Sequence, residues 1–186
     1  MKHSPVRENI IQTASYLFYQ NGYSLTGINE IIKEAGIARA TLYNHFKSKE
    51  DICIAYLKYK NSTFINDIKE FILKAPKGKE QVFSLFKFLE LFFRSRDFNG
   101  CWAINTVSEI PKANSKIRTE IQHQKSQFKT LIETLVESNF SHQPENENKL
   151  LAGHIYLLYE AALSESHLHQ EIWPIELAMD LCKKML

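Results

Sequence analysis

The residues that bend a polypeptide chain are scarce in this sequence. It has 6 glycines and 5 prolines among 186 residues, fewer than a β fold with many tight turns requires, so the scarcity favours long helices. Cysteine is scarce as well. The three thiols, Cys53, Cys101 and Cys182, are odd in number and widely separated, which argues against a disulfide framework and favours a reducing compartment.

Long hydrophobic runs are also missing. The most apolar stretch, residues 82–93, contains Lys87 and Glu90 and is too short to cross a bilayer. Residues 1–22 are amphipathic and lack the continuous apolar core and small-residue cleavage site of a secretion signal. The sequence therefore predicts a cytoplasmic protein with no membrane partner.

The charge is nearly balanced, with a formal net value of +2. Residues 1–50 contain six basic and four acidic side chains, whereas the rest of the chain contains 17 of each kind. The position of this small excess is compatible with nucleic-acid contact near the N-terminus, but a random scatter of charge explains it equally well.

Helical periodicity is what the sequence has in abundance. Apolar residues recur three and four positions apart along nearly the whole chain, and no segment has a convincing strand pattern. Caps, glycines and prolines then divide the chain into about nine helices and predict an all-α fold. The predicted helices cover residues 5–21, 27–35, 39–46, 48 to the loop at 75–78, 80–96, 101–109, 115–139, 148–169 and 174–185.

Residues 27–46 have the pattern of a helix-turn-helix: a short helix, a turn at Gly36 and a second short helix. Leu42 and Phe46, four positions apart, are expected to point inward, which leaves the opposite face of the second helix free for a major groove. That face carries groups able to reach base edges or phosphates, namely Arg39, Ala40, Thr41, Tyr43, Asn44 and His45. Helix starts at Thr26-Gly27 and Ser48-Lys49 would attract phosphate on either side.

This segment resembles the TetR family of bacterial transcriptional regulators over about residues 5–60. The resemblance rests on Thr26, Ile31, Ala35-Gly36-Ile37, the run Thr41-Leu42-Tyr43-Asn44-His45-Phe46, and Ser48-Lys49-Glu50. It implies that Arg39, Ala40, Thr41 and Asn44 face bases, and that Thr26, Tyr43, His45 and Lys49 contact phosphates. Two positions depart from the family pattern: Ala38 stands where Ser or Thr often caps the helix, and Ala40 where Gly or Pro is frequent.

The resemblance also implies a division into a DNA-binding domain, residues 1–48, and a helical effector-binding and dimerisation domain, residues 49–186. Family members usually bind a small effector in the second domain. Phe86, Phe93, Trp102, Asn105, Tyr156 and Tyr159 are the candidate pocket residues. Each aromatic residue can also be read as a core residue, and for a single one of them packing is the simpler interpretation. For the set as a whole, a pocket of some kind is favoured.

Each of the last two predicted helices carries two apolar stripes, which suits packing on its own core and on a partner. The resemblance implies a four-helix homodimer interface. We assign the interface to one stripe of each helix, Leu151, Ile155, Leu158, Ala162, Ile175, Ala178, Met179 and Cys182. The other stripes are Leu150, His154, Leu157 and Ala161, and Leu177, Leu181 and Met185. A monomer with a central helix pair is the alternative.

Other chemistry is weakly represented. Cys101 at a helix start could be a reactive thiol or an inert buried one. His167 and His169, beside Glu165, lie on different helix faces, so we expect no metal site there. We expect no cofactor, and no catalytic constellation stands out. The leading hypothesis is a ligand-responsive homodimeric repressor of a palindromic operator in double-stranded DNA; a ligand-binding sensor with vestigial DNA binding and a small helical enzyme are the alternatives.

Overall fold

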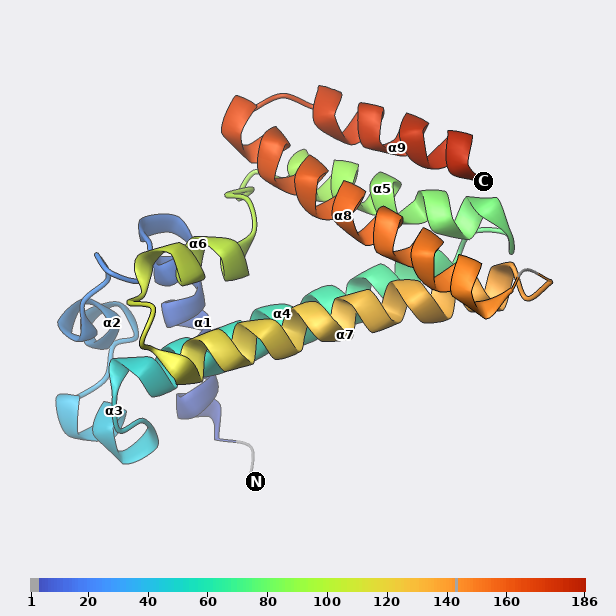
Figure 1. Ribbon diagram of the computed structural model, residues 1–186. Coiled ribbons are helices and arrows are strands. Elements are labelled where there is room, and N and C mark those ends of the chain that lie inside the picture. Colours follow the sequence, from blue (N-terminus) through green and yellow to red (C-terminus); the bar gives the residue numbers. More distant parts are fainter. Residues whose placement is uncertain (1–3, 143) are drawn as a thin grey trace. The chain divides into compact units, whose positions relative to one another are not determined.

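The computed structural model describes residues 4–142 and 144–186, and every regular element in these ranges is an α-helix (Figure 1). The predicted all-α class is therefore confirmed. Nine helices are found in the described residues: α1 (Pro5–Asn21), α2 (Ile28–Glu34), α3 (Arg39–His45), α4 (Lys49–Leu73), α5 (Lys79–Phe93), α6 (Trp102–Glu109), α7 (Ser115–Asn139), α8 (Glu145–His169) and α9 (Trp173–Met185).

The helix ends follow local chemistry. The Ser4 hydroxyl accepts a hydrogen bond from the Arg7 N–H at 3.4 Å, and Pro5 occupies the first helical position, where a missing N–H costs nothing. Between α2 and α3, Gly36 has φ +64°, a left-handed conformation that only glycine adopts readily. The sharp turn of the helix-turn-helix is thus specified by one residue.

Most predicted boundaries lie within one or two residues of the observed ones, and two differ by three residues. Helix α8 begins at Glu145, three positions earlier than expected, because Pro144 precedes it and Glu145 and Glu147 place negative charge in its first turn. Helix α5 ends at Phe93 rather than residue 96. There the Ser95 N–H bonds to the Phe92 carbonyl at 3.1 Å, a tighter turn than an α-helix makes.

The chain folds into two compact units, each built from two stretches of sequence. The first unit comprises residues up to Thr63 together with Trp102–Gln124, and the second comprises Phe64–Cys101 and Lys125–Leu186. Helices α4 and α7 contribute to both. The predicted boundary at residue 48 separates two functions, DNA binding and effector binding, rather than two compact units. It stays a prediction.

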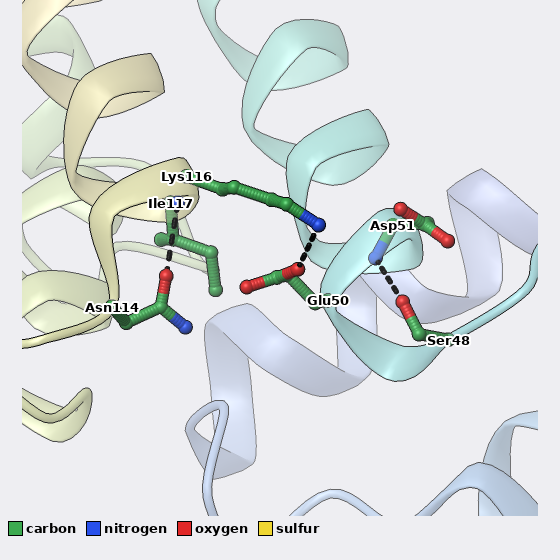
Figure 2. A network of polar contacts seen from close by, with 6 residues as sticks. All are labelled: Ser48, Glu50, Asp51, Asn114, Lys116 and Ile117. Carbon is green, nitrogen blue, oxygen red and sulfur yellow. Dashed lines mark hydrogen bonds and ion pairs between the residues drawn. The ribbon is translucent and has the colours of Figure 1, made fainter.

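The first unit has a core formed by α1 to α4 with α6 and the start of α7. Its fully buried side chains include Ile10, Ala14, Ile31, Leu42, Ile52 and Tyr56. Side-chain contacts tie α4 to α7: Lys116 Nζ lies 3.1 Å from Glu50 Oε2 (Figure 2), and Lys58 pairs with Glu120 at 3.6 Å. The two helices therefore begin side by side and run in the same direction.

The second unit packs α5, α8 and α9 against one another and against the later turns of α4 and α7. Its core includes Val82, Phe86, Leu89, Ile155, Tyr159 and Cys182. Aromatic rings meet edge to face at its centre, as in Phe64 on Phe128 at 5.2 Å and Phe128 on Tyr159 at 4.8 Å. In the described residues, no helix is both long and apolar enough to cross a membrane.

Candidate DNA-binding surface

Helix α3 is held by its inner side chains and leaves its outer side chains free. Leu42 is fully buried and Phe46 is 4% exposed, and the Arg7 guanidinium lies 4.8 Å over the Phe46 ring. The prediction that Leu42 and Phe46 point inward is confirmed. Packing fixes α3 on one side, so its other face can approach a ligand without distorting the core.

The outer face of α3 carries the polar residues expected from the sequence. Arg39, Ala40, Tyr43 and Asn44 are exposed, whereas Thr41 and His45 are half-buried. The Arg39 guanidinium donates to Asn29 Oδ1 of α2 at 2.5 Å, which aims it across the two helices. These side chains offer donors, an acceptor amide and one small residue within one turn and a half of helix, as base and phosphate contact requires.

The start of α3 lacks a side-chain cap. Ala38 occupies the N-cap position and makes no side-chain hydrogen bond there. A Ser or Thr would satisfy one of the free N–H groups and would contribute about 1 kcal/mol. Those N–H groups are consequently open to an acceptor from outside the protein.

Helix α4 begins beside this surface. The Asp51 N–H donates to the Ser48 hydroxyl at 3.1 Å, as capping of this helix by Ser48 predicts, and Asn114 likewise accepts from the Ile117 N–H at the start of α7 (Figure 2). Next to Ser48, the Lys49 ammonium donates to the Ser24 carbonyl at 3.3 Å. It also lies 4.5 Å over the Tyr23 ring. Burial lowers the pKa of Lys49, although Cys53 and Glu109 oppose that shift.

Thr26 requires a correction. It is fully buried rather than exposed, and its hydroxyl donates to the carbonyls of Gly22 and Leu17, at 2.8 and 3.2 Å. Its N–H also bonds to the Gly22 carbonyl at 3.3 Å. The α2 N-cap is Gly27, whose N–H is 3.3 Å from the Glu30 carboxylate. Thr26 therefore shapes the loop before α2 and presents no donor to a phosphate.

Glu109, at the end of α6, is a residue that sequence reasoning did not assign to this surface. Its carboxylate accepts from the Ser24 N–H at 2.7 Å, and its carbonyl accepts from the Ser24 hydroxyl at 3.3 Å. Gly22 has φ +90°, and a Cβ there would lie 2.8 Å from Glu109 Oε1. The carboxylate thus holds the loop between α1 and α2, and the same loop provides the carbonyl that positions Lys49.

The candidate effector residues are divided between the two units. Trp102 and Asn105 belong to the first unit, where the Lys60 ammonium lies 5.6 Å from the Trp102 ring centroid. Phe86, Phe93, Tyr156 and Tyr159 belong to the second. Phe86 and Tyr159 are core residues, 0% and 1% exposed, so packing explains their positions; their part in effector binding stays a prediction.

The predicted homodimer stripe also requires a correction. Five of its eight members, Ile155, Ala162, Ile175, Ala178 and Cys182, are buried in their own unit. The second stripes are the exposed ones: Leu150 is 62% and Leu157 64% exposed on α8, and Leu177 is 52% and Leu181 40% exposed on α9. Periodicity identified two stripes per helix, but it could not indicate which of them the subunit covers itself.

The two histidines near the end of α8 have separate partners. The His167 ring lies 3.1 Å from Asn99 Oδ1, and His169 pairs with Glu165 at 3.3 Å. Within the part of the chain that the structure describes, no three His, Cys, Asp or Glu residues are grouped so that they could hold a metal ion.

This arrangement defines a class: a helix-turn-helix protein with an exposed polar face on its second short helix. Residues 10–56 match the family model described as bacterial regulatory proteins of the tetR family. The chain is 33% identical over 117 residues to the fatty acid metabolism regulator protein of Bacillus subtilis, an alignment that spans 63% of this chain and 59% of that relative.

Other comparisons agree. The chain is 30% identical over 118 residues to the negative transcriptional regulator IcaR of the icaADBC biofilm operon in Staphylococcus epidermidis, covering 63% of this chain and 62% of that one. A TetR-family regulator from Streptomyces coelicolor shares the fold, with a TM-score of 0.86 at 23% identity over 97% of this chain and 93% of that one. FadR from B. subtilis, solved in complex with stearoyl-CoA, has a TM-score of 0.75 at 22% identity over 96% of both chains.

Over residues 10–56 the chain is similar to the TetR family of bacterial regulators. The match covers α1 to the start of α4, which is the segment that carries the surface described above.

Proposed function

We propose that the protein is a ligand-responsive homodimeric repressor that binds a palindromic operator, with each α3 helix in one major groove. The observation that carries the proposal is the outer face of α3. Its polar residues are exposed while Leu42 and Phe46 anchor the helix from beneath. Two similar proteins support repressor action and effector binding. IcaR is described as a negative transcriptional regulator, and FadR was solved in complex with stearoyl-CoA. Such a regulator would act in the cytoplasm, on DNA.

The second copy would bind through the exposed stripes of α8 and α9. The exposed stripe of α8 has spacings of four, three, four and seven residues, which is the pattern of a seam between two paired helices. Its members are Leu150, His154, Leu157, Ala161 and Leu168. Large exposed leucines in register on adjacent helices are uncommon on a monomer and typical of a partner surface. A two-fold dimer would set the distance between the two α3 helices and hence the half-site spacing.

Genomic-fragment selection at physiological salt tests the proposal. The purified chain is mixed with sheared genomic DNA, and the retained fragments are sequenced. We expect enrichment of one short palindrome and loss of that enrichment when Tyr43 and Lys49 are both replaced by Ala. Tyr16→Ala, which removes an aromatic residue 65% exposed on α1, is the matched control and should retain the same palindrome.

The salt dependence separates the proposal from its alternative. A protein that neutralises phosphates loses affinity linearly in log salt, and removing one phosphate contact lowers the slope by about one. If the wild-type chain retains fragments weakly and uniformly, specific regulation is wrong and a ligand-binding sensor with vestigial DNA binding takes its place.

A further inference from the structure

A partly buried polar cluster lies in the second unit and takes no part in the proposed DNA contact. The Lys125 ammonium on α7 donates to both carboxylate oxygens of Glu160 on α8, at 2.7 and 2.6 Å, and to Cys101 Sγ at 3.3 Å. Burial alone would lower the pKa of Lys125, but Cys101 and Glu160 outweigh it and the pKa is raised. Lys125 is therefore a charged donor that lies directly on a thiol.

Tyr159 supplies a second, independent feature. It is 1% exposed, and within the described residues its hydroxyl has no hydrogen-bond partner. Burial, then the charges of Glu160 and Cys101, raise its pKa well above the ordinary value, so the hydroxyl keeps its proton. A buried donor without an acceptor is unusual in a native fold and indicates a place for an acceptor from outside.

The other two thiols have different surroundings. Cys53 and Cys182 are completely buried, and burial raises the pKa of each to about 12. Cys101 is 6% exposed and is the thiol to which a lysine donates. A thiol reacts as its thiolate, and a neighbouring cation stabilises the negative charge on sulfur as it develops. Cys101 is thus the thiol placed for reaction.

The geometry points to Cys101 as a modification site for small α,β-unsaturated carbonyl compounds, with Lys125 beside the sulfur and Tyr159 as the donor for the carbonyl oxygen. In the step, the S–H bond breaks and Sγ bonds to the β-carbon. The π electron pair of the alkene moves toward the carbonyl oxygen, where Tyr159 stabilises the charge, and the thiol proton ends on the α-carbon. The addition needs no oxidant or reductant.

The position of the cluster in the chain gives the adduct a route to regulation, a step that rests on the proposed function. Cys101 is the last residue of the second unit before Trp102, and Lys125 is the first residue of that unit after Gln124. Both residues therefore stand where the chain passes into the unit that carries α3. A substituent on Sγ takes the space of the Lys125 ammonium, which lies 3.3 Å from the sulfur.

The test uses equimolar N-ethylmaleimide and the reduced full-length chain, followed by peptide mapping. We expect the adduct on Cys101 at least about tenfold faster than on Cys53 or Cys182, and no fast adduct in Cys101→Ser. Tyr159→Phe should slow maleimide addition about tenfold, because it removes one donor to the developing oxygen charge. It should leave alkylation by iodoacetamide unchanged, since iodide displacement places no charge on that oxygen. Tyr16→Phe is the matched control and should react like the wild type.

Equal reaction rates at the three thiols in the folded chain would overturn the modification site, and equal slowing by both reagents would overturn the role of Tyr159. DNA retention is then compared before and after treatment. We expect the treated wild type to lose retention and treated Cys101→Ser to keep it; an adduct that leaves retention unchanged would overturn the regulatory step. A chain that retains no DNA before treatment refutes the proposed function, while the mapping still decides the modification site.

Discussion

Replacing Glu109 tests whether α6 maintains the shape of the DNA-binding surface. The Glu109 carboxylate accepts from the Ser24 N–H at 2.7 Å, and the Ser24 carbonyl accepts from Lys49 at 3.3 Å. Glu109→Ala removes the first bond and releases the loop that provides the second. Glu109→Gln keeps an oxygen acceptor for Ser24 and removes only the charge.

The magnitude follows from the contact. A hydrogen bond to a charged group contributes about 1.5–3 kcal/mol, and because Ser24 is exposed we take the lower end of that range. If the loop must be ordered again on DNA, Glu109→Ala should weaken operator affinity by about tenfold, which corresponds to 1.4 kcal/mol. Glu109→Gln should bind DNA as well as the wild type or more tightly, because it removes a negative charge near phosphates.

The assay is a fluorescence anisotropy titration of the selected palindrome at several salt concentrations, with thermal melting of each variant as the check on folding. The salt slope for Glu109→Ala should fall by about one if Lys49 loses its position. Lys69→Ala, which removes an exposed lysine of α4, is the control and should change neither affinity nor slope. If Glu109→Ala and Glu109→Gln both bind DNA more tightly and to the same extent, only the charge of Glu109 affects affinity. The idea that its hydrogen bond to Ser24 maintains the loop is then refuted.

Three further predictions concern stability and assembly. The free energy of unfolding should fall as the pH rises from about 9 to 12, because burial raises the pKa of Cys53 and of Tyr23 to about 12 and the folded state favours their neutral forms. Denaturant titrations at several pH values should show a smaller fall for Cys53→Ala than for the wild type. A free energy of unfolding that does not change with pH would contradict the burial of these two groups. Leu157→Glu combined with Leu181→Glu should convert a dimer into monomers by sedimentation, and an unchanged mass would place the partner elsewhere. Phe128→Ala should lower the free energy of unfolding by about 3–5 kcal/mol, since it empties the aromatic centre of the second unit; a loss below about 1 kcal/mol would mean that the site collapses without strain.

The helix-turn-helix was predictable because its information is local. Gly36 marks the turn, Leu42 and Phe46 mark the buried side of α3, and the exposed residues follow from a period of 3.6. Ser48 and Pro5 likewise place helix starts within a residue of their sequence signals. The turn, the buried side of α3 and the helix starts each depend on residues fewer than five positions apart. A single sequence is therefore sufficient to predict them.

Thr26 shows where a local signal misleads. A threonine before a helical pattern predicts a cap, yet its hydroxyl donates backward to Gly22 and Leu17. The alternative acceptors are carbonyls of α1 and its C-terminal turn, and the choice depends on how the loop is packed. Gly27 can serve as N-cap because Glu30 accepts from its N–H, which frees Thr26 for the interior.

Contacts between residues far apart in the chain could not be predicted from the sequence, for a different reason. Ser24 and Glu109 are 85 positions apart, and Lys125 and Glu160 are 35 apart, and no spacing rule relates residues on different helices. The stripes of α8 and α9 show the same limit. Both stripes are apolar with the same period, and the packing of α5, α8 and α9 on one another determines which side is buried.

The candidate DNA-binding surface has one general property that follows from these bonds. Several of its donors already have acceptors within the protein: Arg39 donates to Asn29, Lys49 to the Ser24 carbonyl, and the Gly27 N–H to Glu30. A phosphate or base must replace these acceptors, so each contact contributes only the difference between two hydrogen bonds. At the start of α3, Ala38 supplies no side-chain acceptor to the first N–H groups of the helix. An uncapped helix start therefore favours DNA over the free state, at the expense of local helix stability.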